Sequence, residues 1–346
     1  MKWNMRRFVL GFLGLVAVAA ILCHREIGNW LHHFPSFSSP VRADDSDAES
    51  PAVKALAEAL KDKDAEVRKN AAQSLGRIGK RAKTAVPALT DALKDSDVDV
   101  RGASALALGR IGKDAGSAAS ALGALLKDKD HDVRGAAALA LSRIGKDAKA
   151  ALPALKELAK DEDKQLQAYA HCALAILEEE PRSHVTALAE ALTDKSAEVR
   201  GTAAYILGEL GSLAKDAVPA LTDALKDKDT AVRRVSAQAL GEMGTAAKSA
   251  VSALASLLKD EDVEVRASAA SALGEIGPDA RAAVPALIEA LKDKEVDVRG
   301  SAIHALGEIG PAAKAAITVL SQALKDEDTE IRKAAVIAIG KIQEMD

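Results

Sequence analysis

The sequence predicts an all-α fold, a right-handed α-α superhelix of about nine helix-pair repeats, each 33 residues long. Three observations lead to this prediction: a recurring Val-Arg dipeptide, glycines in one constant place of each unit, and an aromatic content of only 2%. A body built from Ala, Leu, Val and Ile must form thin, closely packed layers, and stacked helix pairs supply these. The dipeptide register comprises Val67-Arg68, Val100-Arg101, Val133-Arg134, Leu166-Gln167, Val199-Arg200, Val232-Arg233, Val265-Arg266, Val298-Arg299 and Ile331-Arg332.

The first segment of the chain is basic and then apolar. Lys2, Arg6 and Arg7 precede an uncharged run over residues 8–23, about the upper limit of a signal-peptide core and just short of a typical membrane span. We expect residues 1–25 to be a signal anchor or a cleaved signal peptide and residues 26–50 to be a juxtamembrane tether. A misassigned start site is a third alternative. The basic flank predicts a bacterial inner-membrane anchor with the array outside the cytoplasm, or a secreted or periplasmic chain.

One unit, from Arg81 to Gly112, illustrates the predicted helix pair. Apolar spacing predicts a first helix over residues 82–94, which Pro87 either starts or kinks. A turn follows, with Asp97 suited to the N-cap of a second helix over residues 98–112. Gly112 suits the left-handed residue that ends that helix. Equivalent residues recur as Pro153, Pro219 and Pro285, and as Gly79, Gly145, Gly211, Gly244, Gly277 and Gly310.

The arginine of each Val-Arg dipeptide has two predicted uses. Asp64 and Arg68, like Asp97 and Arg101, are four residues apart and can pair on one helix face. Alternatively, each arginine reaches the neighbouring turn and links the units into a structural ladder. The ladder residues are Arg68, Arg101, Arg134, Arg200, Arg233, Arg266, Arg299 and Arg332.

The repeated pattern resembles the HEAT repeat, and more narrowly the short HEAT-like units of phycobilisome bilin lyases. It reads, for example, DVEVRASAASALGEIGPDARAAVPALIEALKD over Asp262 to Asp293. The resemblance implies an α-solenoid over residues 51–346 that binds partners along a concave surface, usually lined by the second helix. It identifies a scaffold and carries no catalytic residue to this chain.

Positions that vary between units are the candidates for specificity. The residue ten places after each Val is basic in the early units and acidic in the late ones, which predicts a polarised groove for a bipolar protein or peptide. Leu106, Leu139, Tyr205 and His304, six places after the Val, are the predicted contacts, with Tyr205 as the hot spot. The charged set is Arg77, Arg110, Arg143, Glu209, Glu242, Glu275 and Glu308. Alternatively, these charges only solvate helix ends or pair with neighbouring side chains, and duplication of two sub-blocks would also produce this pattern.

The fourth unit is irregular. It lacks the Val-Arg pair, and Glu178 stands where glycine ends the second helix of most other units. We expect its second helix to continue to about Glu180 and to stop at Pro181. The unit is interpreted as a hinge, as a partner-specific bump, or as sequence drift.

No catalytic constellation is visible, and we expect neither a cofactor nor a metal. Adjacent helical residues such as His171 and Cys172 point about 100° apart, which suits joint ligation poorly.

The acidic array, in a chain of formal net charge −4, argues against a nucleic-acid partner. Polar residues Lys333, Lys341, Glu344 and Asp346 suit a capped end and favour a monomer. The predicted function is a non-catalytic protein-binding scaffold or adaptor; the alternative is an accessory subunit of a bilin-lyase-like protein-modifying enzyme.

Overall fold

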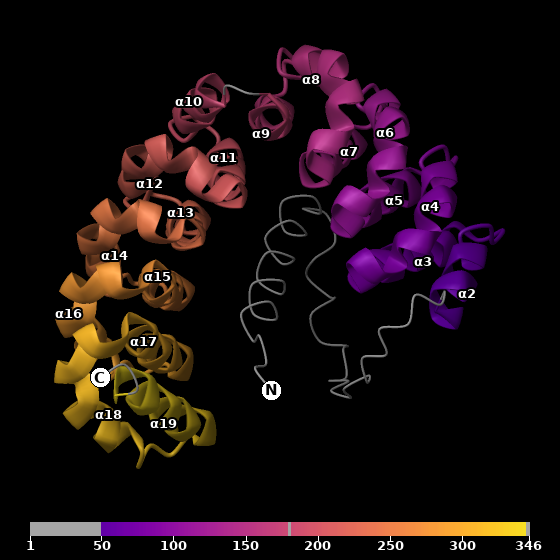
Figure 1. Cartoon of the computed structure of the whole chain (residues 1–346). Coiled ribbons are helices and arrows are strands. Elements are labelled where there is room, and N and C mark those ends of the chain that lie inside the picture. Colours follow the sequence, from indigo (N-terminus) through magenta and orange to yellow (C-terminus); the bar gives the residue numbers. More distant parts are fainter. Residues whose placement is uncertain (1–49, 179–180, 344–346) are drawn as a thin grey trace.

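The computed structural model describes residues 50–178 and 181–343, and all regular structure in these ranges is helical. The helices form consecutive pairs that stack along the chain, which confirms the predicted all-α solenoid. The stack curves into an open arc (Figure 1), with the first helix of each pair on the outer side and the second on the inner side.

The helix pairs are regular in length. The outer helices are α2 (Pro51–Ala59), α4 (Val86–Ala92), α6 (Ala119–Leu125), α8 (Leu152–Leu158), α10 (Arg182–Ala191), α12 (Val218–Ala224), α14 (Val251–Leu257), α16 (Val284–Ala290) and α18 (Ile317–Ala323). The inner helices are α3 (Ala65–Ile78), α5 (Val98–Ile111), α7 (His131–Ile144), α9 (Lys164–Leu177), α11 (Ala197–Leu210), α13 (Thr230–Glu242), α15 (Val263–Ile276), α17 (Val296–Ile309) and α19 (Thr329–Gln343).

The segment before most outer helices is a 3₁₀ turn rather than α-helix. In the unit that begins at Gly79, the 3₁₀ segment runs to Ala85, and Pro87 occupies the first turn of α4. Pro87 therefore starts the α-helix, because its missing N–H is not needed there. The 3₁₀ segments are η2 (Gly79–Ala85), η3 (Gly112–Ala118), η4 (Gly145–Ala151), η5 (Gly211–Ala217), η6 (Gly244–Ala250), η7 (Gly277–Ala283) and η8 (Gly310–Ala316).

Local residues define both ends of the inner helices. The Asp97 carboxylate accepts hydrogen bonds from the backbone N–H groups of Asp99 and Val100, at 3.0 and 3.2 Å, and so caps α5. Gly112 ends the helix with φ 76° and ψ −139°. The positive φ agrees with the prediction that a glycine ends the helix. The ψ value, however, lies outside the left-handed helical region, in a part of φ/ψ space that essentially only glycine adopts.

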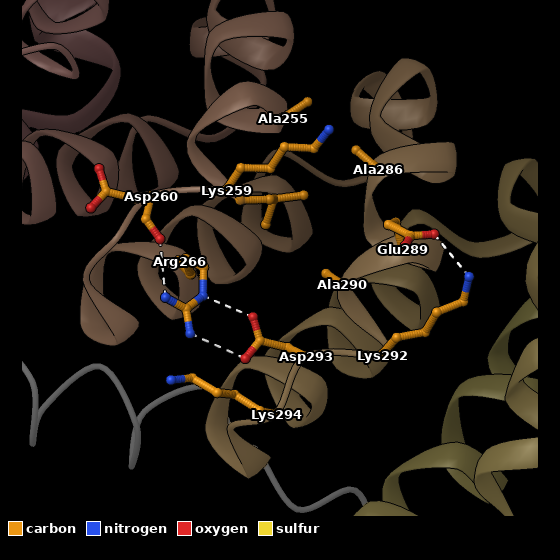
Figure 2. A pocket seen from close by; sticks show the side chains of 11 residues that line it. Ala255, Lys259, Asp260, Arg266, Ala286, Glu289, Ala290, Lys292, Asp293 and Lys294 are labelled. Carbon is orange, nitrogen blue, oxygen red and sulfur yellow. Dashed lines mark hydrogen bonds and ion pairs between the residues drawn. The ribbon is translucent and has the colours of Figure 1, made fainter.

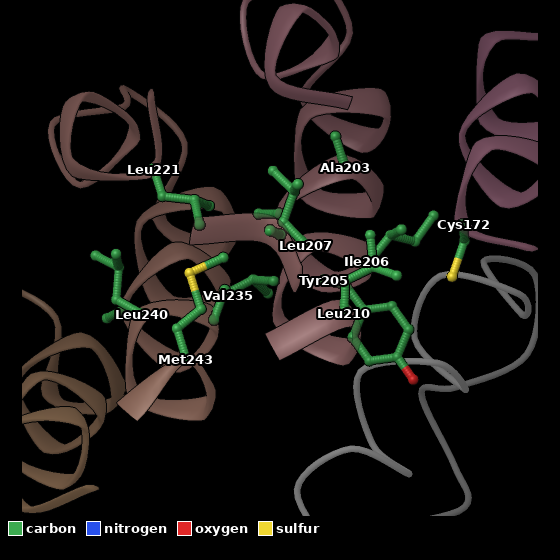
Figure 3. Close-up of a cluster of buried hydrophobic side chains, with 14 of the residues drawn as sticks. Cys172, Ala203, Tyr205, Ile206, Leu207, Leu210, Leu221, Val235, Leu240 and Met243 are labelled. Carbon is green, nitrogen blue, oxygen red and sulfur yellow. The ribbon is translucent and has the colours of Figure 1, made fainter. Parts of the chain in front are cut away.

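The core consists of small aliphatic side chains in thin layers. Between α11 and α13, for example, Leu207, Leu221 and Leu240 are buried together (Figure 3). Neighbouring inner helices touch backbone to backbone: a Cβ placed on Gly274 would meet the Cα of Ala305 at 2.9 Å. This spacing leaves no room for rings at the contact and accounts for the low aromatic content of the array.

The irregular fourth unit differs from its neighbours at the end of α9. The helix ends at Leu177, and Glu178 adopts an extended conformation with φ −92° and ψ 158°. The predicted continuation to about Glu180 was therefore wrong; residues 179 and 180 lie outside the described ranges. Glu178 has a side chain that disfavours the positive φ of the equivalent glycines.

Within the described ranges, no helix combines the length and the apolar character that crossing a bilayer requires. The predicted membrane segment, residues 8–23, lies outside those ranges, as do the signal segment 1–25 and nearly all of the tether.

Candidate functional site

The ladder arginines connect each helix pair to the next. Arg200 donates from Nε and Nη2 to the two carboxylate oxygens of Asp227, at 2.6 and 2.7 Å. Its Nη1 donates to the backbone carbonyls of Asp194 and Lys195. Both partners of the ion pair are nearly buried, and although burial alone opposes the charge, the Arg200 hydrogen bond lowers the pKa of Asp227. The arginine thus ties together two turns of adjacent units.

The same bidentate contact recurs, with interruptions. Arg134 lies 4.0 Å from Asp161, and Arg299 approaches Asp326 at 3.3 Å in a looser geometry. The expected pairing of Asp97 with Arg101 on one helix is absent from this ladder, because Asp97 is engaged as the N-cap of α5. The bidentate pairs are Arg68 with Asp95, Arg101 with Asp128, Arg200 with Asp227, Arg233 with Asp260 and Arg266 with Asp293.

A surface hollow is also part of this ladder. It has a volume of about 380 Å³ and lies beside the turn that follows α16. Arg266 crosses it to Asp293, while Lys259, Lys292 and Lys294 surround the opening (Figure 2). Since its central charges are already paired, this hollow is a by-product of the link between units.

The predicted basic residues lie on three successive inner helices. Arg77 is on α3, Arg110 on α5 and Arg143 on α7. Burial, together with the charges of Arg143 and Arg77, lowers the pKa of Arg110. Within the described residues, Arg110 has no ion-pair partner. These three side chains, here called the basic row, therefore form a strip of mutually repelling cations.

The predicted acidic residues continue along the same face. Glu209, Glu242, Glu275 and Glu308, on α11, α13, α15 and α17, are here called the acidic row. Glu242 keeps contact with solvent, yet the surrounding protein and the carboxylates of Glu209 and Glu275 raise its pKa to about 8. Glu242 therefore ionises less readily than an isolated glutamate, because its negative charge would be crowded against those of its neighbours in the row.

The two rows meet across the irregular unit. Arg143 Nη2 lies 3.2 Å from Glu209 Oε2 and 3.0 Å from the Tyr205 hydroxyl, which donates to Glu209 Oε1 at 3.0 Å. The intervening helix, α9, carries Ile176 at the equivalent place, so the contact spans two units. Although burial opposes the charge, Glu209 and Tyr205 together raise the pKa of Arg143.

The predicted apolar contacts are less accessible than expected. Tyr205 is only 6% exposed: it belongs to a cluster of buried side chains (Figure 3), and its hydroxyl is held by Arg143 and Glu209. Leu139 is 2% exposed, whereas Leu106 remains half-buried. The prediction that Tyr205 projects freely into a groove is therefore corrected: it is a buried link between the two rows.

Two further residues of the acidic end are paired. His304 is exposed, with Nε2 3.4 Å from Glu308 Oε1. Lys341 Nζ lies 2.7 Å from the same oxygen, a contact that the sequence interpretation missed. His304 lies one helical turn before Glu308, and Lys341 lies one 33-residue unit after it. This spacing was the signal in the sequence that could have predicted both contacts.

The histidines of the irregular unit form a chain of contacts between α8, α9 and α10. His171 Nδ1 lies 3.0 Å from His184 Nδ1, and His184 Nε2 lies 2.8 Å from Glu178, which also pairs with Lys156. Burial, with the neighbouring His184, lowers the pKa of His171 to about 4. Cys172 is buried away from this chain, and burial raises its pKa to about 12. No cluster of three or more His, Cys, Asp or Glu residues suited to a metal occurs within residues 50–178 and 181–343.

Comparison with known proteins identifies the repeat. The family described as HEAT repeats matches residues 44–108, 86–175, 185–256, 218–298 and 284–346. No curated protein matches the chain. The crystal structure of an engineered protein from a structural genomics consortium is similar, with 26% sequence identity and a TM-score of 0.47, over 85% of this chain and 89% of that one.

Proposed function

The chain belongs to the HEAT-repeat family, and on that premise we propose that it is a non-catalytic scaffold or adaptor that binds a bipolar polypeptide on its inner face. The acidic part of the partner lies over the basic row, Arg77, Arg110 and Arg143. Its basic part lies over the acidic row, Glu209, Glu242, Glu275 and Glu308. A HEAT-repeat scaffold fits a protein-binding role in general, and the polarity of the inner face supplies the specificity.

The observation that carries the proposal is the grouping of basic side chains in one row and acidic side chains in another on one face. Within the described residues, Arg110 and Glu242 lack ion-pair partners, and the pKa of each is shifted against its charged form. A partner with the opposite charge would relieve that repulsion, so binding would be favoured at both rows. Glutamate near the C-terminal end of a helix opposes the helix dipole, which argues against a purely local stabilising role.

Binding of synthetic peptides to the full chain tests the proposal directly. Three peptides of equal length are compared at low salt: one acidic at its N-terminal half and basic at its C-terminal half, one acidic throughout, and one basic throughout. We expect the bipolar peptide to bind most tightly, and added salt to weaken binding because exposed charges are screened. Equal affinity for all three peptides would refute a polarised surface.

Two neutralised variants locate the binding surface. Glu242→Gln with Glu275→Gln should weaken binding of the basic peptide alone, and Arg77→Gln with Arg110→Gln should weaken binding of the acidic peptide alone. A matched control, Glu157→Gln with Glu289→Gln, removes two exposed carboxylates at the outer helices. If the control weakens binding as much as the inner-face variant, the inner face is not the site. Affinity capture with the full chain, followed by mass spectrometry, would then identify the natural partner.

The proposed location of the scaffold is the outer side of a bacterial inner membrane, anchored or exported through residues 8–23. The basic flank of Lys2, Arg6 and Arg7 and the apolar run support this. Cell fractionation of a C-terminally tagged chain, with N-terminal sequencing, separates an anchored chain from a cleaved one. A soluble chain with its original N-terminus would contradict both.

The alternative function, an accessory subunit of a bilin-lyase-like enzyme, rests on the resemblance of the repeats. A change in absorbance when the chain is mixed with a tetrapyrrole-bearing protein would test it.

A further inference from the structure

The junctions between neighbouring units follow two charge rules. First, each ladder arginine reaches the aspartate that lies 27 residues further along, as Arg68 reaches Asp95. Second, where a cation follows that arginine, it approaches the acidic residue that directly precedes the next unit's Val. Lys69 Nζ lies 3.6 Å from Asp99, and Arg234 Nε lies 3.4 Å from Glu264.

The last described unit carries both cations, and no other described unit packs against its far side. Arg332 donates to the carbonyls of Asp326 and Glu327 and to the Thr329 hydroxyl. No carboxylate within the described residues pairs with it. Lys333 is exposed and pairs with Glu330 of its own helix at 2.8 Å.

The first described unit carries both acceptors, and no other described unit packs against its near side to supply the cations. Asp62 is at the place occupied by Asp95 in the next unit, and its Oδ1 accepts the backbone N–H of Asp64. No cation among residues 50–178 and 181–343 forms an ion pair with it. Glu66, at the place of Asp99, is 61% exposed and pairs with Lys69 of its own helix. The two ends of the arc are therefore complementary in charge and in register.

Apolar side chains are exposed at the same two ends. Val336 on α19 is 61% exposed, whereas its counterpart Ile303 is 1% exposed. Leu324, which follows α18, is 38% exposed. At the other end, Val67 is 41% exposed, whereas Val100 is fully buried. A further helix pair packed on either end of the described array would cover these apolar side chains.

The backbone around Gly340, in the last described unit, also leaves space for a neighbouring helix. Gly340 has no atom within 4 Å of the position that a Cβ would take. At the equivalent Gly109, Ala140 of the next unit fills that place, its Cα 2.9 Å away. In the first unit the residue equivalent to Ala140 is Ser74, which is small enough to enter.

We propose that the chain associates head to tail with a second copy of itself, the last helix pair of one copy packing on the first helix pair of the other. Arg332 pairs with Asp62, Lys333 pairs with Glu66, and Ser74 lies against Gly340. Such a contact is heterologous, so it closes into a ring or extends into a filament. It uses the ends of the arc rather than the inner face, and it replaces the monomer expected from the polar residues near the C-terminus.

Sedimentation velocity of the full chain in mild detergent, over a range of concentrations, tests the association. We expect the sedimentation coefficient to rise with concentration. Lys333→Glu or Glu66→Lys alone should move the midpoint to about fivefold higher concentration, because a cross-copy ion pair becomes a repulsion. The combination of both changes in one chain should restore the original midpoint. Lys195→Glu, an exposed cation in the middle of the array, is the matched control and should leave the midpoint unchanged.

Cross-linking between differently substituted chains tests the register. Both chains carry Cys23→Ser, and the buried Cys172 is retained. Under mild oxidation, Gly340→Cys mixed with Ser74→Cys should form a disulfide-linked dimer, because the equivalent internal contact brings the Cβ positions within 3.2 Å. Gly340→Cys mixed with Ser252→Cys, on the exposed side of α14, should not. A concentration-independent sedimentation coefficient of a monomer, or equal cross-linking in both mixtures, would overturn the proposal.

Discussion

The guanidinium of Arg143 and the carboxylate of Glu209 lie 3.2 Å apart, although a complete helix pair separates the units that carry them. Both side chains are about 30% exposed, so solvent weakens the attraction. The hydroxyl of Tyr205 contacts both groups and fixes their geometry. Ile176, at the equivalent place on α9, is uncharged, so the ion pair of Arg143 and Glu209 connects the basic row to the acidic row across that helix.

A double-mutant cycle measures this link. For Arg143→Gln and Glu209→Gln, we expect a coupling of about 1 kcal/mol in the free energy of unfolding, followed by urea denaturation. Glu157, near the end of α8, and Lys160, in the turn that follows, form a highly exposed pair that provides the control and should couple by about 0.3 kcal/mol or less. A coupling for Arg143 and Glu209 no larger than the control would show that the contact is incidental.

The ladder arginines should differ in their contribution to stability. Arg200→Gln leaves the carboxylate of Asp227 nearly buried without its partner, so we expect a loss of about 3 kcal/mol. Arg134→Gln should cost about 1 kcal/mol or less, since Arg134 lies 4.0 Å from Asp161 and its Nε has no hydrogen-bond partner. The natural Gln167 shows that glutamine keeps the carbonyl contact, at 2.6 Å to Asp161. Chemical denaturation of both variants checks the difference, and equal losses would contradict it.

Glycines within the inner helices should respond oppositely to alanine. Gly274→Ala places a Cβ 2.9 Å from the Cα of Ala305, so α15 and α17 must separate, and we expect a loss of about 2 kcal/mol. Gly201→Ala meets no atom within 4 Å and should add about 0.5–1 kcal/mol, because alanine favours the helix. Thermal unfolding of the two variants decides the matter. Stabilisation by Gly274→Ala would disprove the close approach.

The histidine chain should make stability depend on pH between about 4 and 6.5. The pKa of His171 is lowered to about 4 in the folded state, so the unfolded chain binds more protons in this window. Its contribution of about 2 kcal/mol is complete above pH 6.5 and is lost as the pH falls. The groups that face it along the chain of contacts are His184, Glu178 and Lys156. Urea denaturation at pH 7 and pH 5 should show a smaller difference for His171→Gln than for the wild type; parallel losses would argue against this assignment.

Glu242 should produce the opposite dependence at higher pH. Its folded-state pKa is raised to about 8, so its contribution is complete below pH 4.5 and is lost as the pH rises through 8. The melting temperature of the wild type should therefore fall relative to Glu242→Gln between pH 6 and 9. Glu289→Gln, an exposed carboxylate on the outer side, should show no such trend. A constant difference across this range would mean that the acidic row carries no strain.

The regular parts of the fold could be predicted because they repeat. The 33-residue register placed Asp97 at a helix start and Gly112 at a helix end, and the structure agrees with both. The 3₁₀ turns were missed because apolar spacing does not separate 3₁₀ from α-helix over one or two turns. Gly274 was missed as a packing residue because a glycine inside a helix carries no local signal of what lies against it.

The inner face was less predictable. The sequence placed Arg143 and Glu209 on one face, but their contact depends on the path of α9 between them. The burial of Tyr205 likewise depends on long-range packing. The ends of helices follow from nearby residues, whereas contacts across a unit follow from the curvature of the whole stack.

The interruption of the ladder also divides the array mechanically. Bidentate arginine–aspartate pairs join the units before Arg134 and those from Arg200 onward, apart from the looser contact at Arg299. Between these two groups, Arg134 lies 4.0 Å from Asp161, and Gln167 replaces the ladder arginine. In a one-dimensional array, cooperativity passes only through neighbouring junctions, so a weak junction separates two unfolding domains. Under a stretching force applied to its two ends, the array should therefore unfold first around α9 and leave two folded segments of unequal length.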